Sequence, residues 1–212
     1  MSEKNFAPED RDPSDARLFS PSAGRNQAVI ADVLAGVLPA NATVLEIASG
    51  TGEHGIANVT RRPDVTWQFS DPDETARASQ AAWAAHTGLG DLPPLAIDTT
   101  RTDWAIKLPK YDALYCANMI HIAPWDAAVG LAQGADTLLD AGGQVILYGP
   151  FFFGENSAPS NLAFDANLKG RNSTWGVRQI ESVKHIFAKK GFNIAKLRDM
   201  PKNNFLLGLS RH

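Results

Sequence analysis

The segment 43-TVLEIASGTGEHGIA-57 constrains the fold more than any other stretch of the sequence. Apolar residues on both sides of a glutamate predict a buried strand, a glycine loop follows, and a helix is predicted over residues 53–61. Such a loop lets backbone approach a ligand closely, at the edge of a parallel sheet where the strands end. The segment therefore predicts an α/β fold with a ligand site beside the glycines.

The rest of the chain alternates between the two periodicities. Helices are predicted over residues 25–38, 53–61, 73–87, 125–139 and 177–190, and strands over 44–47, 65–69, 95–97, 111–120 and 144–149. Two final strands, from residue 192 and over 205–209, are separated by a short turn and should pair as an antiparallel hairpin. We expect a Rossmann-like, doubly wound, seven-stranded sheet that is mostly parallel and ends in this hairpin.

The length of 212 residues favours one domain with a single core. Residues 1–22 are rich in Asp, Ser and Pro and are expected to form a flexible N-terminal arm, followed by a single domain over residues 23–212. Residues 150–172 are predicted to be a loop, and a lid-like insertion is expected at about 150–175 because the segment follows the fifth strand at the ligand edge.

Charge and composition exclude several classes of partner. The net charge of −3 does not indicate the basic surface that binds nucleic acid. No uncharged run is long enough to span a membrane. The lone Cys116 cannot form an internal disulfide, which favours a cytoplasmic location. Scattered histidines without zinc-ligand spacing predict no metal site.

The order of residues in the glycine loop bears on the kind of ligand. The pattern is E-x-A-x-G-x-G, formed by Glu46, Ala48, Gly50 and Gly52. Dinucleotide-binding loops instead read G-x-G-x-x-G and face a pyrophosphate, which a neighbouring carboxylate would repel. A carboxylate suits a ligand with a cationic amino group and a sulfonium, and the pattern resembles that of class I methyltransferases that use S-adenosyl-L-methionine (SAM).

A narrower resemblance extends from about Leu18 to the C-terminus. It is carried by 18-LFSPSAGRN-26, 44-VLEIASGTGEHG-55, 67-WQFSDPD-73, 116-CANMIHIAPW-125, 147-LYGPF-151, 159-PSNLAFDANL-168, 175-WGVR-178 and 200-MPKNN-204. These segments are similar to the methyltransferase-like protein 26 family. The resemblance implies the fold and SAM as cofactor, but it supplies no substrate. Ala48 departs from the broader methyltransferase pattern, in which a glycine is usual, and its methyl group narrows the loop.

The resemblance also implies further contacts with the cofactor. Asp71, at the end of the second strand, would accept both ribose hydroxyls, although NAD enzymes use the same device. Asp98 would accept from the adenine amino group, and Thr99 would add a backbone contact. Asn118 would offer its carbonyl to the amino group of the methionine portion. The alternative for Asp71 and Asp98 is that they merely begin turns.

Two residues beside the loop are weaker candidates for the cofactor site. Arg25 opens the first predicted helix and could bind the carboxylate of SAM with two parallel hydrogen bonds, or it could lie in solvent. His54 follows the glycine loop directly and either contacts the ligand or has a structural role in the first helical turn.

The acceptor side is predicted after the fourth and fifth strands. Methyl transfer from a sulfonium is an in-line displacement, in which the protein chiefly aligns the reactants and excludes water. His121 is the candidate base if the acceptor needs one, with packing between apolar neighbours as the alternative. Candidate substrate contacts, chosen for their mixed aromatic and polar character, are Tyr148, Ser160, Asn161, Asp165, Trp175 and Arg178.

The sequence thus favours a SAM-dependent methyltransferase that acts on a small-molecule acceptor and binds neither nucleic acid nor a membrane. Two rival functions stay open. One is a module that binds SAM or S-adenosylhomocysteine (SAH) without catalysis, as a sensor or partner subunit. The other is an NAD-dependent oxidoreductase, which the Glu46 carboxylate and the terminal hairpin disfavour. The acceptor and the oligomeric state do not follow from the sequence.

Overall fold

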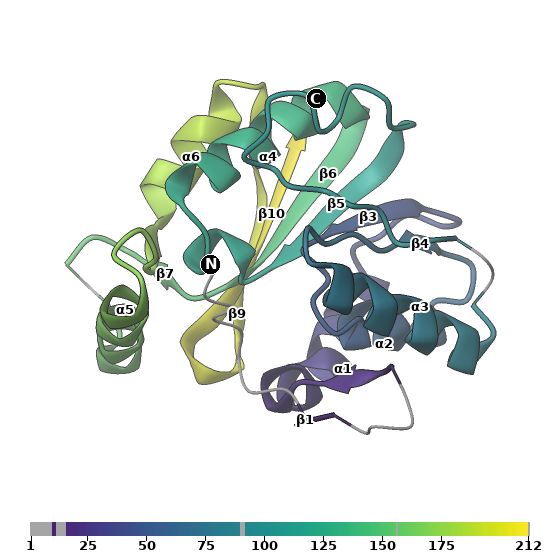
Figure 1. The fold of residues 1–212 in the computed structure, drawn as a ribbon. Coiled ribbons are helices and arrows are strands. Elements are labelled where there is room, and N and C mark those ends of the chain that lie inside the picture. Colours follow the sequence, from purple (N-terminus) through teal and green to yellow (C-terminus); the bar gives the residue numbers. More distant parts are fainter. Residues whose placement is uncertain (1–9, 12–15, 90–91, 156, 212) are drawn as a thin grey trace. The chain divides into compact units, whose positions relative to one another are not determined.

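The computed structural model describes residues 10–11, 16–89, 92–155 and 157–211, and the chain divides into two compact units. Unit 1 ends at Ile97 and unit 2 begins at Asp98. The fold is α/β, with a mostly parallel sheet and a C-terminal antiparallel hairpin, as predicted (Figure 1). The expected division into an arm over residues 1–22 and one domain over 23–212 stays a prediction.

The described part of unit 1 contains two parallel strands, three helices and a small antiparallel pair. Strand β3 (Thr43–Ile47) pairs with β4 (Thr66–Gln68); the helices are α1 (Pro21–Ala35), α2 (Glu53–Arg61) and α3 (Glu74–Thr87); and β1 (Asp10–Arg11) pairs with β2 (Leu18–Phe19). The last four residues of β3 are buried, as expected for a strand covered on both faces. Unit 1 therefore presents the glycine loop directly after a fixed core strand.

Helix α1 begins four residues earlier than the apolar pattern predicts. The Ser20 hydroxyl accepts a hydrogen bond from the amide of Ala23, and Pro21 occupies the first turn. A serine cap followed by proline is a favoured start because proline has no amide hydrogen to leave unpaired there. The helix starts where its cap lies, whereas the apolar pattern reports only where its buried face begins.

The prediction of seven strands is wrong, because residues 95–97 do not form a strand. Only an isolated bridge between Ser70 and Leu95 remains. Pro93 and Pro94 precede this short run, and proline cannot donate to a strand ladder. The described residues give two strands of the main sheet in unit 1 and four in unit 2, six in all.

Unit 2 contains the other four strands. Strand β5 (Tyr111–Ala117) runs parallel to β6 (Leu139–Gly149), β10 (Asn204–Arg211) is antiparallel to β6, and β9 (Phe192–Met200) forms the edge. The smaller elements are η1 (Met119–His121), η2 (Pro201–Asn203), β7 (Phe151–Phe152) and β8 (Arg178–Gln179). Helices α4 (Trp125–Leu138) and α6 (Ile180–Ala188) lie side by side (Figure 1).

The prediction of a loop over residues 150–172 is also wrong. Its second half is helix α5 (Pro159–Arg171), a 13-residue element in which only Asn161 and Leu168 are buried. Apolar periodicity arises when a helix packs one face on a core, and a helix this exposed has little of it. The helix was therefore missed for lack of a buried stripe, although Pro159 at its first turn is a recognised start signal.

Candidate functional site

In the glycine loop after β3, every second residue has a left-handed backbone conformation. Ala48, Gly50 and Gly52 have φ angles of 55°, 56° and 95°, all in the left-handed region. At Gly52 a Cβ atom would also lie 3.2 Å from the Cα of Gln80, so the loop and α3 approach too closely for a side chain. Ala48 holds this backbone despite its methyl group, which in a left-handed conformation costs about 1 kcal/mol.

Backbone amides of the loop are already engaged within unit 1. The Ser49 amide donates to the Ser70 carbonyl at 2.8 Å, and the Gly52 amide donates to the Ser49 carbonyl at 3.0 Å. The Gly50 amide donates to Oδ2 of Asp71, also at 3.0 Å. Phosphate-binding loops depend on free amides that point at the anion. These three amides are directed at protein acceptors, so the loop is poorly suited to a diphosphate.

Asp71 is fixed at the end of β4 by two backbone amides. Its Oδ2 accepts from Gly50, and its Oδ1 accepts from the Asp73 amide at 2.9 Å. The side chain is 4% exposed, and burial raises the pKa of the carboxyl. Each carboxylate oxygen can accept more than one hydrogen bond, so Asp71 retains capacity for two hydroxyls. The geometry fits the predicted contact with a ribose.

Glu46 is a buried carboxyl next to Asp71. It is 1% exposed, and its Oε2 accepts from the indole nitrogen of Trp67 at 2.9 Å. Burial raises the pKa of Glu46 to about 8, and the charge of Asp71 adds to this effect, while the Trp67 hydrogen bond opposes it. A positive group arriving beside Glu46 would favour its ionised form. Two carboxyls at neighbouring strand ends therefore prepare this site for a cation.

Three buried polar residues that the sequence did not single out support the loop from two helices. Glu53 on α2 and Ser79 on α3 bond to Thr51 of the loop. Gln80 donates from Nε2 to the Gly50 carbonyl at 2.9 Å, and its Oε1 is buried without a hydrogen-bond partner among the described residues. An available signal was polar residues at core-facing positions of an alanine-rich helix, since such residues are rarely buried unless they are bonded.

His54 and Arg25 differ in how they are placed. The Nε2 atom of His54 lies 2.8 Å from Oδ1 of Asn26, which ties α2 to α1, and burial lowers the pKa of His54 to about 4. Its carbonyl accepts from the Asn58 side chain. Arg25 is exposed on α1. The observed bonds give His54 a structural role, and cofactor contact by either residue stays a prediction.

In unit 2 the predicted cofactor residues lie in two turns. Oδ1 of Asp98 accepts from both the amide and the hydroxyl of Thr100, which is the turn-forming role named as its alternative. Thr99 is buried. A Cβ atom added at Gly130 would lie 1.7 Å from the carbonyl oxygen of Thr99, so this close approach requires glycine at position 130. Asn118 has a left-handed φ of 60°, directly after β5. Their contact with a cofactor stays a prediction.

His121 is completely buried in unit 2. Neither ring nitrogen has a hydrogen-bond partner among the described residues, and the ring packs edge-on against Phe151 with centroids 5.3 Å apart. A Cβ at position 149 would lie 2.6 Å from His121 Nε2, so Gly149 leaves room for the ring. Burial lowers the pKa of His121 to about 3, with a further contribution from Arg178. The imidazole is therefore neutral near pH 7.

Arg178 holds the turn that carries His121. Its Nε donates to the Ile120 carbonyl at 2.8 Å. Its Nη2 donates to the carbonyls of Ala123 and Thr174, at 2.8 and 2.9 Å. The guanidinium thus fastens residues 120–123 from the side, and these bonds give the predicted substrate residue a structural role.

The other predicted substrate residues also have partners within unit 2. Ser160 and Asn161 bond to Asn203 of the β9–β10 turn, through the Ser160 hydroxyl and the Asn161 amide nitrogen. Oδ1 of Asp165 accepts from the Val177 amide. The guanidinium of Arg171 lies over the Trp175 ring, 5.5 Å from its centroid. The backbone carbonyl of Tyr148 accepts a hydrogen bond from the Asn118 amide. Substrate contact by these residues stays a prediction.

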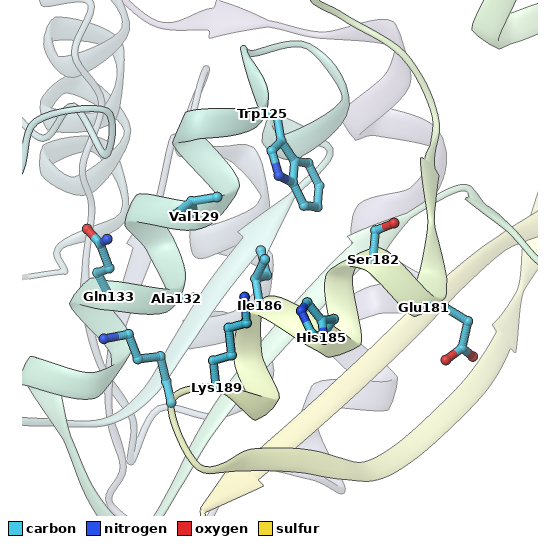
Figure 2. Close-up of a pocket in the computed structure, with 10 residues that line it drawn as sticks. Trp125, Val129, Ala132, Gln133, Glu181, Ser182, His185, Ile186 and Lys189 are labelled. Atoms are coloured by element: carbon cyan, nitrogen blue, oxygen red, sulfur yellow. The ribbon is translucent and has the colours of Figure 1, made fainter.

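A groove lies elsewhere in unit 2, between α4 and α6 (Figure 2). It has a volume of about 720 Å³ and contains none of the predicted site residues. The lining side chains are Trp125, Val129, Ala132, Gln133, Glu181, Ser182, His185, Ile186, Lys189 and Lys190. In the part of the chain that the structure describes, no His, Cys, Asp and Glu side chains cluster into a metal-binding group, and no helix is long and apolar enough to cross a membrane.

Solved structures with a similar fold include several methyltransferases. An O-methyltransferase family protein from Burkholderia thailandensis is 16% identical with a TM-score of 0.76, over 90% of this chain and 57% of that one. CalO1, a methyltransferase of calicheamicin biosynthesis solved with SAH bound, is 15% identical with a TM-score of 0.74, over 90% and 54%. An O-methyltransferase family 2 protein from Planctomyces limnophilus, in complex with apigenin, is 18% identical with a TM-score of 0.72, over 90% and 61%.

These likenesses show that the chain shares the fold of these three proteins. The chain spans between 54% and 61% of the length of the three proteins. A family model described as "Protein of unknown function (DUF938)" matches residues 17–211, so the chain belongs to this family.

Proposed function

We propose that the protein is a methyltransferase that uses SAM and acts on a small molecule. The observation that carries this proposal is the chemistry of the glycine loop in unit 1. The amides of Ser49, Gly50 and Gly52 are engaged by protein acceptors, and the carboxyls of Glu46 and Asp71 lie beside them. Such a site favours a cationic nucleoside over a diphosphate.

In this proposal Asp71 accepts the ribose hydroxyls, because its two oxygens are held in place by backbone amides and keep free lone pairs. Glu46 supplies negative charge towards the amino group or the sulfonium. The loop of Ala48, Gly50 and Gly52 lets the cofactor approach the backbone closely. SAM, when bound, would supply an activated methyl group for an in-line displacement.

His121 is proposed as the base where the acceptor must lose a proton. The low pKa of His121 keeps the imidazole in the neutral form that can accept one. The ring is 0% exposed, so the turn over residues 120–123 would have to open before an acceptor could reach it. The two hydrogen bonds from Arg178 to the carbonyls of Ile120 and Ala123 oppose such opening.

Three more specific assignments belong to the same proposal. Membership of the methyltransferase-like protein 26 family, a cytoplasmic location and a small-molecule acceptor are proposals. They are supported by the quoted sequence segments, by the lone cysteine and by the class of enzymes that share the fold. The non-catalytic SAM-binding module is the second candidate, because His121 is buried in this structure.

Two experiments test the proposal. Mass spectrometry of the purified protein should detect bound SAH or SAM, and thermal unfolding should shift upward with either ligand and less with NADH. A ligand at 100 times its dissociation constant stabilises by about 2.7 kcal/mol. A larger shift with NADH would favour the oxidoreductase. SAM binding without transfer of a labelled methyl group to any metabolite in a cell extract would favour the non-catalytic module.

A further inference from the structure

A short strap, residues 18–20, lies against α3 in unit 1. The amide of Leu18 donates to the hydroxyl of Ser79 at 2.8 Å, and its carbonyl accepts from the indole nitrogen of Trp83 at 3.1 Å. Ser79 and Trp83 are four residues apart and so lie on one face of the helix. Phe19 packs edge-on against Trp83, with ring centroids 5.1 Å apart. The backbone of Leu18 is therefore held by two side chains of one helix face.

The hydroxyl of Ser79 also reaches the glycine loop. It donates to the Thr51 carbonyl at 2.7 Å while it accepts from the Leu18 amide. A serine hydroxyl has a single hydrogen to donate, so both partners fix its orientation. Ser79 is 0% exposed, and no solvent competes for either bond. One buried hydroxyl thus links the strap to the loop.

Glu53 makes a second link from another helix. Its Oε2 accepts from the Ser20 amide at 2.7 Å and from the Thr51 hydroxyl at 2.8 Å. The side chain is 7% exposed. Thr51 lies between Gly50 and Gly52 in the loop. Its carbonyl accepts from Ser79 and its hydroxyl donates to Glu53, and these two side chains also bind the strap.

We infer that Ser79 and Glu53 are positioning residues that make the shape of the glycine loop depend on the docking of residues 18–20. The loop contains left-handed positions, and such positions persist where surrounding contacts over-determine them. Release of the strap would remove the Leu18 and Ser20 amides that orient the Ser79 and Glu53 side chains toward Thr51. This inference rests on the proposed role of the loop in binding the cofactor, and it assigns cofactor affinity in part to residues that do not touch the cofactor.

Trp83→Phe tests the link, because Trp83 bonds to the strap and not to the loop. Phenylalanine keeps the packing against Phe19 and removes one hydrogen bond. The variant should weaken SAH binding by about threefold to tenfold. Hydrogen exchange of the amides at residues 48–53 should become faster without ligand. Unchanged affinity and unchanged exchange would overturn the inference.

A double-mutant cycle separates coupling from general destabilisation. Ser79→Ala should weaken SAH binding, and the double variant Ser79→Ala, Trp83→Phe should be weakened less than the product of the two single effects. Multiplicative effects would show that the two residues act independently and would overturn the inference. Glu53→Gln, which keeps an acceptor oxygen, should bind SAH more tightly than Glu53→Ala, and equal losses would count against a positioning role.

Arg62→Met is the matched control. Arg62 donates to the carbonyls of Ala35, Leu38 and Pro39, away from the strap and the loop. The Arg62→Met substitution should lower the melting temperature of the protein and leave its affinity for SAH unchanged. If wild-type protein fails to bind SAH, the proposed function fails, while the exchange rates of residues 48–53 still report on the link itself.

Discussion

The two units differ in how their buried polar side chains are bonded. In unit 1 the carboxyls of Glu46 and Asp71 and the hydroxyl of Ser79 all have hydrogen-bond partners, although Oε1 of Gln80 has none among the described residues. In unit 2 the ring of His121 is fully buried with neither nitrogen bonded among the described residues. Unpaired buried polar groups are costly and are retained where they serve function or await a ligand.

The candidate binding loop of unit 1 is therefore held in its shape by bonded side chains, whereas the turn at residues 118–123 of unit 2 is packed around an unbonded ring. The loop is supported by side chains from α2 and α3. The turn is fastened from outside by Arg178. We expect ligand affinity to respond to changes in unit 1, and stability and its pH dependence to respond to changes in unit 2.

The largest effect is expected from Asp71→Ala in unit 1. The variant removes the acceptor of two backbone amides together with the proposed ribose contacts. SAH affinity measured by calorimetry should fall roughly 100-fold, because each hydrogen bond to a charged group contributes about 1.5 to 3 kcal/mol. Asp64→Ala is the matched control, since Asp64 also accepts a backbone amide but at a distant turn. Equal affinity of Asp71→Ala and wild type would remove Asp71 from the site.

Arg178→Met should produce the next effect, on the stability of the protein. It leaves the carbonyls of Ile120, Ala123 and Thr174 without their donor. The free energy of unfolding in urea should decrease by roughly 2 to 3 kcal/mol. Arg171→Met, which loses the contact with the Trp175 ring and none of these three hydrogen bonds, should change the free energy of unfolding less. Similar losses in the two variants would contradict the role of Arg178 as the fastener of this turn.

His121→Leu should make the protein less sensitive to acid. The folded-state pKa of about 3 lies below the ordinary value of 6.5, so the folded protein binds fewer protons than the unfolded chain between those values. Stability contributed by the neutral ring is therefore present above pH 6.5 and is lost as the pH falls. At pH 5 the variant should gain about 2 kcal/mol relative to wild type, beyond any difference at pH 8. Urea unfolding at both pH values measures this, and an identical difference at the two pH values would refute it.

Ala48→Gly should have the smallest effect. It relieves the left-handed backbone at φ 55° and should stabilise the protein by about 1 kcal/mol or less, because glycine also makes the unfolded chain more flexible. Ala195→Gly in the exposed part of β9 is the control and should destabilise it. Thermal unfolding of both variants is sufficient. A destabilised Ala48→Gly would show that the methyl group makes contacts that outweigh the strain.

Much of the fold follows from local sequence pattern. Strand β3, helix α2 and the terminal hairpin lie where periodicity and turn residues place them, since each buries one regular face or closes through a short connection. The pattern fails where burial is absent, as in α5, and where proline interrupts a short run, as at residues 95–97. The apolar pattern also predicts that α1 begins at residue 25, where its buried face starts, although the helix begins at Pro21 after the Ser20 cap.

The candidate site was predictable only in part. Glu46, Gly50 and Asp71 were found because a strand, a loop and a helix bring them together locally. Ser79 and Gln80 were not found, because their bonds join residues 61 and 30 positions apart. A single sequence does not identify the partners in such distant pairs, although polar residues at core-facing positions of α3 indicate that some partner exists. The burial of His121 was weighed only as packing between neighbours, and the close approach of Gly149 came from the structure.

Calorimetric titration of the wild-type protein with SAH and with NAD at pH 7.5 tests the central claim most directly. The engaged amides and the two buried carboxyls of the glycine loop predict that SAH binds at least tenfold more tightly than NAD. Tighter binding of NAD would show that the loop accommodates a diphosphate and would contradict the account.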